Sequence, residues 1–214
     1  MTHHDLTTDD DAGAADDDDL DPDAADGWEV LVEHDPGLWI ALPDRWPHQG
    51  HETARSWIAA TVRDVVARSA APTRAGKKWL TKVLDRLSTW QTPNELKFLY
   101  LPSLSSELSL LRIQFGLAAG DRDETLRALV LESDLLALEP PLLETVTTDS
   151  LGAGVHGLRY AELDGRLTVT SVSAFRSGPF DLRVTCEVGP PELVPVLAAA
   201  ARDFVDGISV VRSA

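Results

Sequence analysis

The sequence predicts an α+β fold: a largely antiparallel sheet with a C-terminal meander, covered by an N-terminal helical pair and a C-terminal helix. Three observations support this prediction. Apolar and polar residues alternate in three runs between 155 and 188, apolar residues recur at helical spacing between 52 and 90, and two prolines at 190–191 open a last apolar helix. Strands joined by short turns favour antiparallel pairing over a doubly wound parallel sheet.

The first extended segments are residues 28–33 and 38–42, the second of which is followed by Pro43. The segment between them, 34–37, reads His-Asp-Pro-Gly, which is typical of a turn. Two extended runs around such a turn predict a β-hairpin.

Two amphipathic helices are expected next, at 52–69 and from about 76 to Trp90, where Pro93 prevents further extension. The apolar residues of the first helix are Trp57, Ile58, Val62, Val65 and Val66. Those of the second are Trp79, Leu80, Val83, Leu84, Leu87 and Trp90. Each set recurs at helical spacing, so each helix is expected to bury one face.

The middle of the chain is expected to form strands at 96–101, 108–117 and 143–149, with a short helix at 122–131. The strongest strand signal follows, because the dipeptide Asp164-Gly165 separates two alternating runs and both of its residues accept a positive φ. The three strands of this meander are expected at 155–163, 166–175 and 180–188.

The closing helix is expected to begin at Pro190-Pro191 and to end at Gly207, before an extended segment at 208–211. Its apolar face is predicted to consist of Leu193, Val196, Leu197, Ala200 and Phe204. The chain from 27 to 214 is therefore interpreted as one domain, which is long enough to bury a substantial core.

Charge divides the chain unevenly. Residues 1–26 hold eleven aspartates and no lysine or arginine, and they contribute −11 of the formal net charge of −16. With so few apolar residues, this segment is predicted to be a disordered acidic tail. By contrast, residues 51–90 carry eight basic against three acidic side chains. The overall negative charge argues against nucleic acid as a partner.

The layout resembles the Mog1/PsbP-like fold over about residues 28–211. The resemblance rests on the opening segment from Trp28 to Trp46, with a strand that ends in Leu-Pro-Asp-Arg-Trp, on an early helix, on the meander and on the long closing helix. Members of that group are mostly binding modules, among them GTPase-interacting proteins, photosystem subunits, bacterial lipoproteins and secretion-adaptor chaperones. The resemblance therefore implies a protein partner. This chain departs from the pattern through its second helix and its acidic tail, and no family residues are carried over.

The sequence contains no recognisable catalytic, metal or cofactor motif. His48 and His51 are three apart in a loop, whereas a metal site needs three or four convergent ligands, so a surface loop is the favoured interpretation. Cys186 alternates with Val184 and Val188 in a predicted strand, which indicates a buried small hydrophobic residue. One cysteine and no apolar run of about 18 residues favour a cytoplasmic protein without membrane insertion. The richness in alanine, aspartate and arginine, with few lysines, suggests a bacterial source.

The candidate binding residues lie on the second helix. Lys78, Lys82 and Arg86 recur every four residues beside two tryptophans, Trp79 and Trp90. A solvated basic face and tryptophans packed in the core are the plain interpretations. The functional one is a docking surface for another protein with an acidic or apolar segment, which the acidic tail masks until the partner displaces it.

The leading functional hypothesis is a non-catalytic adaptor or chaperone-like protein of a bacterial cytoplasmic system, secretion being one setting. One alternative is a small-ligand-binding protein or enzyme with a pocket between the sheet and the first helices, using His48, His51 or His156. Another is a structural subunit of a larger assembly. Convergent polar groups in a deep pocket would favour the ligand-binding alternative, and an exposed apolar surface beside the basic residues would favour the adaptor.

Overall fold

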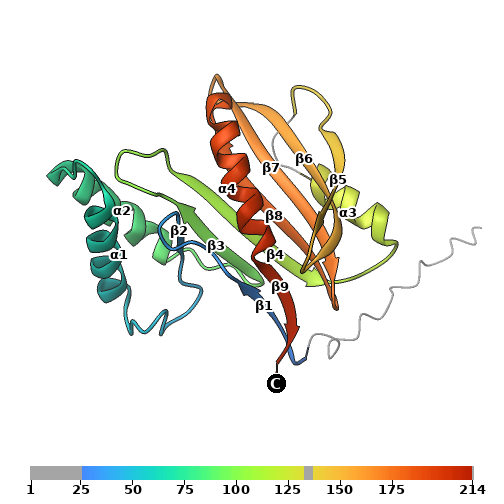
Figure 1. Cartoon of the computed structure of the whole chain (residues 1–214), viewed down its shortest axis with the longest axis horizontal. Helices are drawn as coiled ribbons and strands as arrows, with labels where there is room; N and C mark the ends of the chain where they lie inside the picture. The colour runs from blue at the N-terminus through green and yellow to red at the C-terminus, as the bar shows by residue number, and fades with distance from the viewer. Residues whose placement is uncertain (1–25, 133–136, 214) are drawn as a thin grey trace, which may run out of the picture.

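The computed structural model describes residues 26–132 and 137–213 and confirms the predicted α+β class. Its main feature is a seven-stranded antiparallel sheet with helices packed on both faces (Figure 1). In spatial order the strands are β2 (Trp39–Ala41), β3 (Glu95–Tyr100), β4 (Ser109–Leu117), β8 (Phe180–Gly189), β7 (Arg166–Ser177), β6 (Gly152–Leu163) and β5 (Leu142–Thr148).

The predicted meander is confirmed as β6, β7 and β8. Asp164 and Gly165 have φ values of 52° and 73°, which a tight turn of this hand requires, and they place Leu163 opposite Arg166. This turn sets the register of the whole β6–β7 pair. A second turn, with Gly178 at φ 55°, leads into β8.

One face of the sheet, called here the α4 face, is covered by α4 (Val194–Asp206) and holds the larger core (Figure 1). The predicted start at Pro190-Pro191 is a short 3₁₀ helix, η2 (Pro191–Leu193), and α4 begins after it at Val194. Gly207 follows the last residue of α4, as the sequence predicts. Val196 was assigned to the buried face, and that prediction is wrong because the residue is 60% exposed. The helix instead turns Leu197, Ala201 and Phe204 to the sheet.

The opposite face, called here the α3 face, carries the predicted helical pair at one end of the sheet. The pair consists of α1 (Ala54–Arg68) and α2 (Arg74–Ser88), each capped by a threonine hydroxyl that accepts from a backbone N–H, at Thr53 and Thr73. Trp57 of α1 and Leu80 and Leu84 of α2 are buried against β2, β3 and β4.

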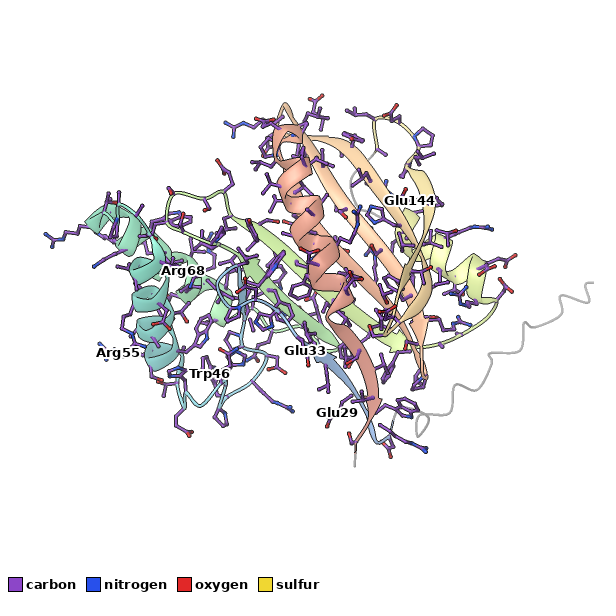
Figure 2. All side chains as sticks on the ribbon, in the orientation of Figure 1. Glu29, Glu33, Trp46, Arg55, Arg68 and Glu144 are labelled. Atoms are coloured by element: carbon purple, nitrogen blue, oxygen red, sulfur yellow. The ribbon has the colours of Figure 1, made fainter. Side chains whose placement is uncertain are left out.

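Side chains at the two ends of α1 attach it to its surroundings. Trp46 lies beside the start of α1 in Figure 2, and its ring is 6.4 Å from that of Trp57, centroid to centroid. At the other end, Arg68 donates from Nε to the carbonyl of Pro102 and from Nη2 to that of Leu101.

At the other end of the α3 face lies α3 (Arg122–Leu131), which forms as the sequence predicts. The Asp121 carboxylate caps its start by accepting from two backbone N–H groups. Leu126 and Val130 pack on Val172 and Ala174 of β7. Helices therefore cover both ends of this face.

The predicted N-terminal hairpin is wrong, although both of its strands exist. β1 (Trp28–Val32) pairs with β9 (Ile208–Arg212) in a separate two-stranded ribbon, whereas β2 pairs with β3 of the large sheet. Asp35 accepts bonds from the N–H groups of Leu38 and Trp39, so the intervening turn redirects the chain between the two sheets. An alternating run specifies a strand but not its partner.

Gly154 of β6 provides a test of the packing. A Cβ atom at this position would lie 2.4 Å from the Phe175 ring and 2.5 Å from the Ala174 carbonyl. We expect Gly154→Ala to lower the free energy of unfolding by about 1–3 kcal/mol, as overpacked sites do. Urea denaturation measures this loss.

The matched control is Gly116→Ala in β4, where a Cβ would meet no atom within 4 Å. Its effect should stay within about 0.5 kcal/mol. Equal stability of the two variants would contradict the close packing of the Phe175 ring against β6.

Candidate functional site

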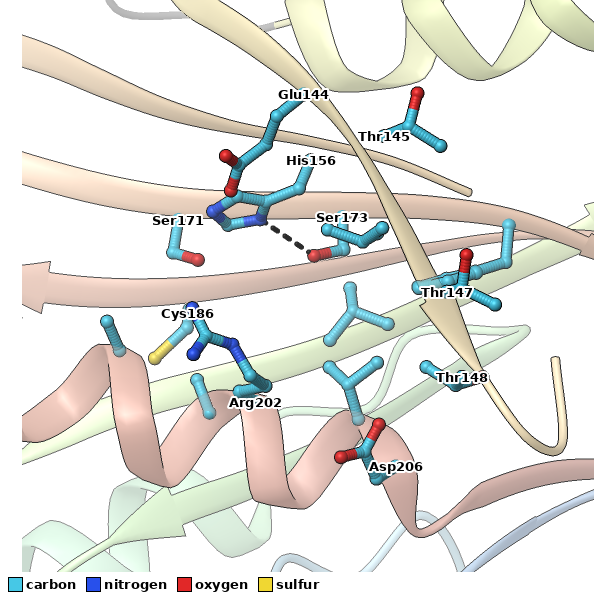
Figure 3. Close-up of a pocket in the computed structure, with 16 residues that line it drawn as sticks. Glu144, Thr145, Thr147, Thr148, His156, Ser171, Ser173, Cys186, Arg202 and Asp206 are labelled. Carbon is cyan, nitrogen blue, oxygen red and sulfur yellow. Dashed lines mark hydrogen bonds between the residues drawn. The ribbon is translucent and has the colours of Figure 1, made fainter. Parts of the chain in front are cut away.

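A cavity of about 300 Å³ lies on the α4 face, between α4, the edge strand β5 and the strands β6, β7 and β8 (Figure 3). Its walls combine apolar and polar groups. The apolar lining includes Val146, Phe175, Val184, Ala198, Ala201 and Val205. The polar lining includes Glu144, Thr148, His156, Ser171, Ser173, Arg202 and Asp206.

Three polar residues of the cavity form one row across neighbouring strands. Glu144 of β5 is opposite His156 of β6, which is opposite Ser173 of β7. His156 Nδ1 and Ser173 Oγ are hydrogen bonded at 2.9 Å. In Figure 3 the Glu144 carboxylate approaches the imidazole from the side of β5. The row therefore runs from an exposed carboxylate to a buried hydroxyl.

The environment of His156 favours its neutral form. Burial lowers the pKa of the imidazole, Glu144 opposes this and Arg202 reinforces it, so the pKa lies below 6.5. At neutral pH the ring is uncharged, with one nitrogen that donates and one that accepts. The inner part of the cavity thus offers neutral hydrogen-bonding groups.

The charged residues stand nearer to solvent. Arg202 and Asp206 are one turn apart on α4 and both extend toward the cavity in Figure 3. Both are exposed, as is Glu144 on the opposite wall. Charges of both signs therefore surround the entrance.

Cys186 lines the floor of the cavity and is buried, as predicted. Burial raises the pKa of its thiol to about 11, against a weaker opposing effect of the Ser109 hydroxyl at 3.5 Å. The thiolate is the reactive form of cysteine, so this thiol is a poor nucleophile at neutral pH.

The row of Ser173, His156 and Glu144 contains the group types of a nucleophilic triad. Acyl transfer also needs hydrogen-bond donors aimed at the developing oxyanion. β7 is paired on both sides, with β6 and with β8, so the backbone N–H groups around Ser173 belong to the sheet. Those N–H groups are therefore engaged in strand pairing.

The five residues predicted as a protein-binding site are all exposed on or just after α2. We call Lys78, Lys82, Arg86, Trp79 and Trp90 the α2 ridge. Trp79 is 42% exposed and Trp90 38% exposed, so core packing does not account for these two tryptophans. The ammonium of Lys97 lies 5.4 Å from the centroid of the Trp90 ring.

The other predicted histidines lie away from the cavity. His48 and His51 form a backbone bridge to each other, and the His48 ring contacts Trp46 and Trp57 edge to face. Within residues 26–132 and 137–213, no group of three or more His, Cys, Asp or Glu side chains could hold a metal ion. Of the three histidines named for the ligand-binding alternative, only His156 lines the cavity.

The cavity is on the face opposite to the first helices, contrary to the predicted location. Glu144, Ser173 and Arg202 were not singled out from the sequence, yet one signal was available. A two-residue turn at 164–165 that places 163 opposite 166 also places His156 opposite Ser173. The approach of Arg202 depends on how α4 crosses the sheet, which no local pattern specifies.

In the part of the chain that the structure describes, no helix is both long and apolar enough to cross a membrane. Residues 1–25 lie outside that part. The disorder of the acidic tail and its masking of the α2 ridge therefore stay predictions.

No protein-family model matches the sequence, and no curated protein matches it significantly. Among solved structures, the chain is similar to the crystal structure of LpqN, a protein involved in cell envelope biogenesis of Mycobacterium tuberculosis. The two share 10% identity at a TM-score of 0.41, over 86% of this chain and 84% of LpqN. A likeness at this TM-score supports no functional conclusion.

The lowered pKa of His156 predicts how stability depends on pH. At a pH between the pKa of His156 in the folded protein and 6.5, the unfolded chain binds the proton more readily than the folded one. The free energy of unfolding therefore falls as the pH drops below about 6.5. We expect His156→Gln to flatten this fall, by at most about 1.4 kcal/mol per pH unit. Urea unfolding between pH 5 and 7.5 measures it.

Burial lowers the pKa of His48 in the same direction, so His48→Gln should remove a separate part of the fall. NMR titration of the imidazoles assigns each part. A His156 signal that titrates at 6.5 or above would contradict the buried, neutral ring.

Proposed function

We propose that the chain is a non-catalytic binding protein that holds a small molecule in the cavity of the α4 face. The observation behind this proposal is the convergence of side chains from β5, β6, β7 and α4 on one partly apolar cavity. Its volume of about 300 Å³ is in the range of small-molecule sites.

The lining indicates the kind of ligand. Phe175, Val184 and Val205 offer apolar surface, whereas Ser171 and Ser173 are buried hydroxyls beside a neutral imidazole. A charged group deep in such a site would lose its hydration without a partner of opposite charge. The ligand class that fits is a small amphipathic molecule with an uncharged polar end, such as a hydroxyl or an amide, directed at His156 and Ser173.

A cavity-filling substitution tests this proposal. Ala198→Leu adds three carbon atoms to the α4 wall of the cavity and should weaken binding at least about tenfold. The ligands are hits from an NMR screen of neutral amphipathic molecules that shift the resonances of His156 and Ser173. Ser173→Ala should weaken the same hits about 3–10-fold, through loss of one hydrogen bond.

Val196→Leu is the matched control, since Val196 lies on the same helix and is exposed. It should leave the affinity unchanged. Hits that bind Ala198→Leu as well as they bind the unmodified protein would refute the site.

A second candidate function is supported by the exposure of Trp79 and Trp90 on the α2 ridge. Tryptophan and arginine are both enriched in protein interfaces. We therefore also propose an adaptor or chaperone-like role, as in Mog1/PsbP-like proteins, for a partner with an acidic or apolar segment. The ridge and the cavity lie on different faces of the sheet, so one protein can have both functions.

The acidic tail provides the probe for this second function. A synthetic peptide of residues 1–26 should bind protein that lacks those residues. Its affinity should fall as the salt concentration is raised from about 20 mM, where charges are weakly screened, to about 500 mM, where they are strongly screened. Tryptophan fluorescence reports binding. Replacing Lys78, Lys82 and Arg86 by glutamate should abolish it.

The control carries Arg55→Glu and Arg63→Glu, which place the same kind of charge reversal on exposed positions of α1. This variant should keep most of the affinity. Binding that is the same for both variants, or that does not respond to salt, would rule out the ridge as the tail's target.

A further inference from the structure

A second cavity, of about 500 Å³, lies on the α3 face, over strands β4, β8, β7 and β6. Three arginines project into it from three strands: Arg112 of β4, Arg183 of β8 and Arg159 of β6. The described lining includes two acidic residues, Glu132 and Glu187, so positive charge is in excess. Three guanidinium groups thus gather on one face of the sheet, beside the C-terminal end of α3.

The sheet register brings these residues together. Arg112 is opposite Thr185, and Thr170 lies between Arg159 and Glu187 in the neighbouring row. All five are on the same face, because positions two apart on a strand share a face. Neighbouring strands of the large sheet therefore position these guanidinium groups.

Part of this arrangement is structural. Arg159 donates from Nη2 to the carbonyl of Leu131, and Arg183 from Nη2 to that of Glu132. Both carbonyls are at the C-terminal end of α3, where backbone acceptors lack helical partners and cations are favourable. Each of these two guanidinium groups therefore uses its Nη2 to hold the end of α3 on the sheet.

Other donors of the cavity remain unused. The Nε of Arg159, the Nε of Arg112 and the hydroxyl of Thr185 are buried and have no hydrogen-bond partner in the described structure. Arg159 is 8% exposed and Thr185 4% exposed. Arg112 reaches carboxylates only at long range, 3.7 Å to Glu95 and 3.8 Å to Glu187. Buried donors without acceptors are rare in folded proteins.

We propose that this cavity binds an oxyanion, a phosphate or carboxylate group of a small molecule, between Arg112, Arg159 and Thr185. The guanidinium group presents donors in a planar fork that matches both kinds of oxyanion. The hydroxyl of Thr185, on the floor between β4 and β7, supplies a further donor. This site is independent of the ligand pocket on the α4 face, because the sheet separates them.

Titration of the full chain with inorganic phosphate, succinate and chloride at constant ionic strength tests the proposal. Two-dimensional NMR should show saturable shifts at β4, β6 and β8 for phosphate or succinate and none for chloride. Tighter binding of phosphate identifies a phosphorylated ligand, and tighter binding of succinate a carboxylate ligand. Equal responses to all three salts would overturn the proposal.

Two variants locate the site. Thr185→Val keeps the shape of the side chain and removes an unpaired hydroxyl, so the protein should fold, and its affinity for the bound oxyanion should fall about 3–10-fold. Arg159→Met should cause a larger loss, at least about tenfold. Thr81→Val makes the same exchange at an exposed position of α2 and should leave the affinity unchanged. Unchanged affinity in Thr185→Val would refute the site even if Arg159→Met fails to fold.

Discussion

The antiparallel register of β6, β7 and β8 is the constraint on which both sites of this protein depend. It is set by tight turns in which Asp164, Gly165 and Gly178 adopt positive φ. The register aligns His156 with Ser173 on one face and Arg159 with Thr170 on the other. Because side chains alternate along a strand, a slip by one residue would exchange the two faces. The turns thus determine the chemistry of each cavity as well as the topology.

The two faces present different chemistry because different elements cover them. On the α4 face, a long apolar helix and the β1–β9 ribbon enclose a large core, and the cavity at its edge combines apolar walls with a neutral imidazole. On the α3 face, the helices stand at the two ends of the sheet. The polar side chains between them, including the buried pair of Lys97 and Glu95 at 3.2 Å, form an ionic layer instead of an apolar core. A neutral ligand suits the first environment and an anion the second.

Local patterns were sufficient for most elements. The positions of α1, α2, α3 and the meander agree with the periodicity, since helical spacing and strand alternation reflect one buried face. Local patterns failed where the pairing of a strand depends on a partner far away in the sequence. β1 pairs with β9 across nearly the whole sequence, and the turn before β2 leads to another sheet instead of closing a hairpin. The same limit applies to Trp79, which has the spacing of a core residue on α2 but is exposed because Leu80 and Leu84 face the sheet.

Residue patterns alone were enough to establish the fold class, the meander with its turn at 164–165, the buried state of Cys186 and the basic residues along α2. The pairing of His156 with Ser173 could also be predicted from them, because a two-residue turn sets which residues lie opposite each other along the hairpin that it closes. The three-dimensional structure was needed to show that Arg202 and Asp206 of α4 border the His156 cavity and that Arg112 and Arg159, from strands far apart in sequence, share another. Those groupings depend on how the helices cross the sheet and on the order of its strands, which arise from packing between distant segments.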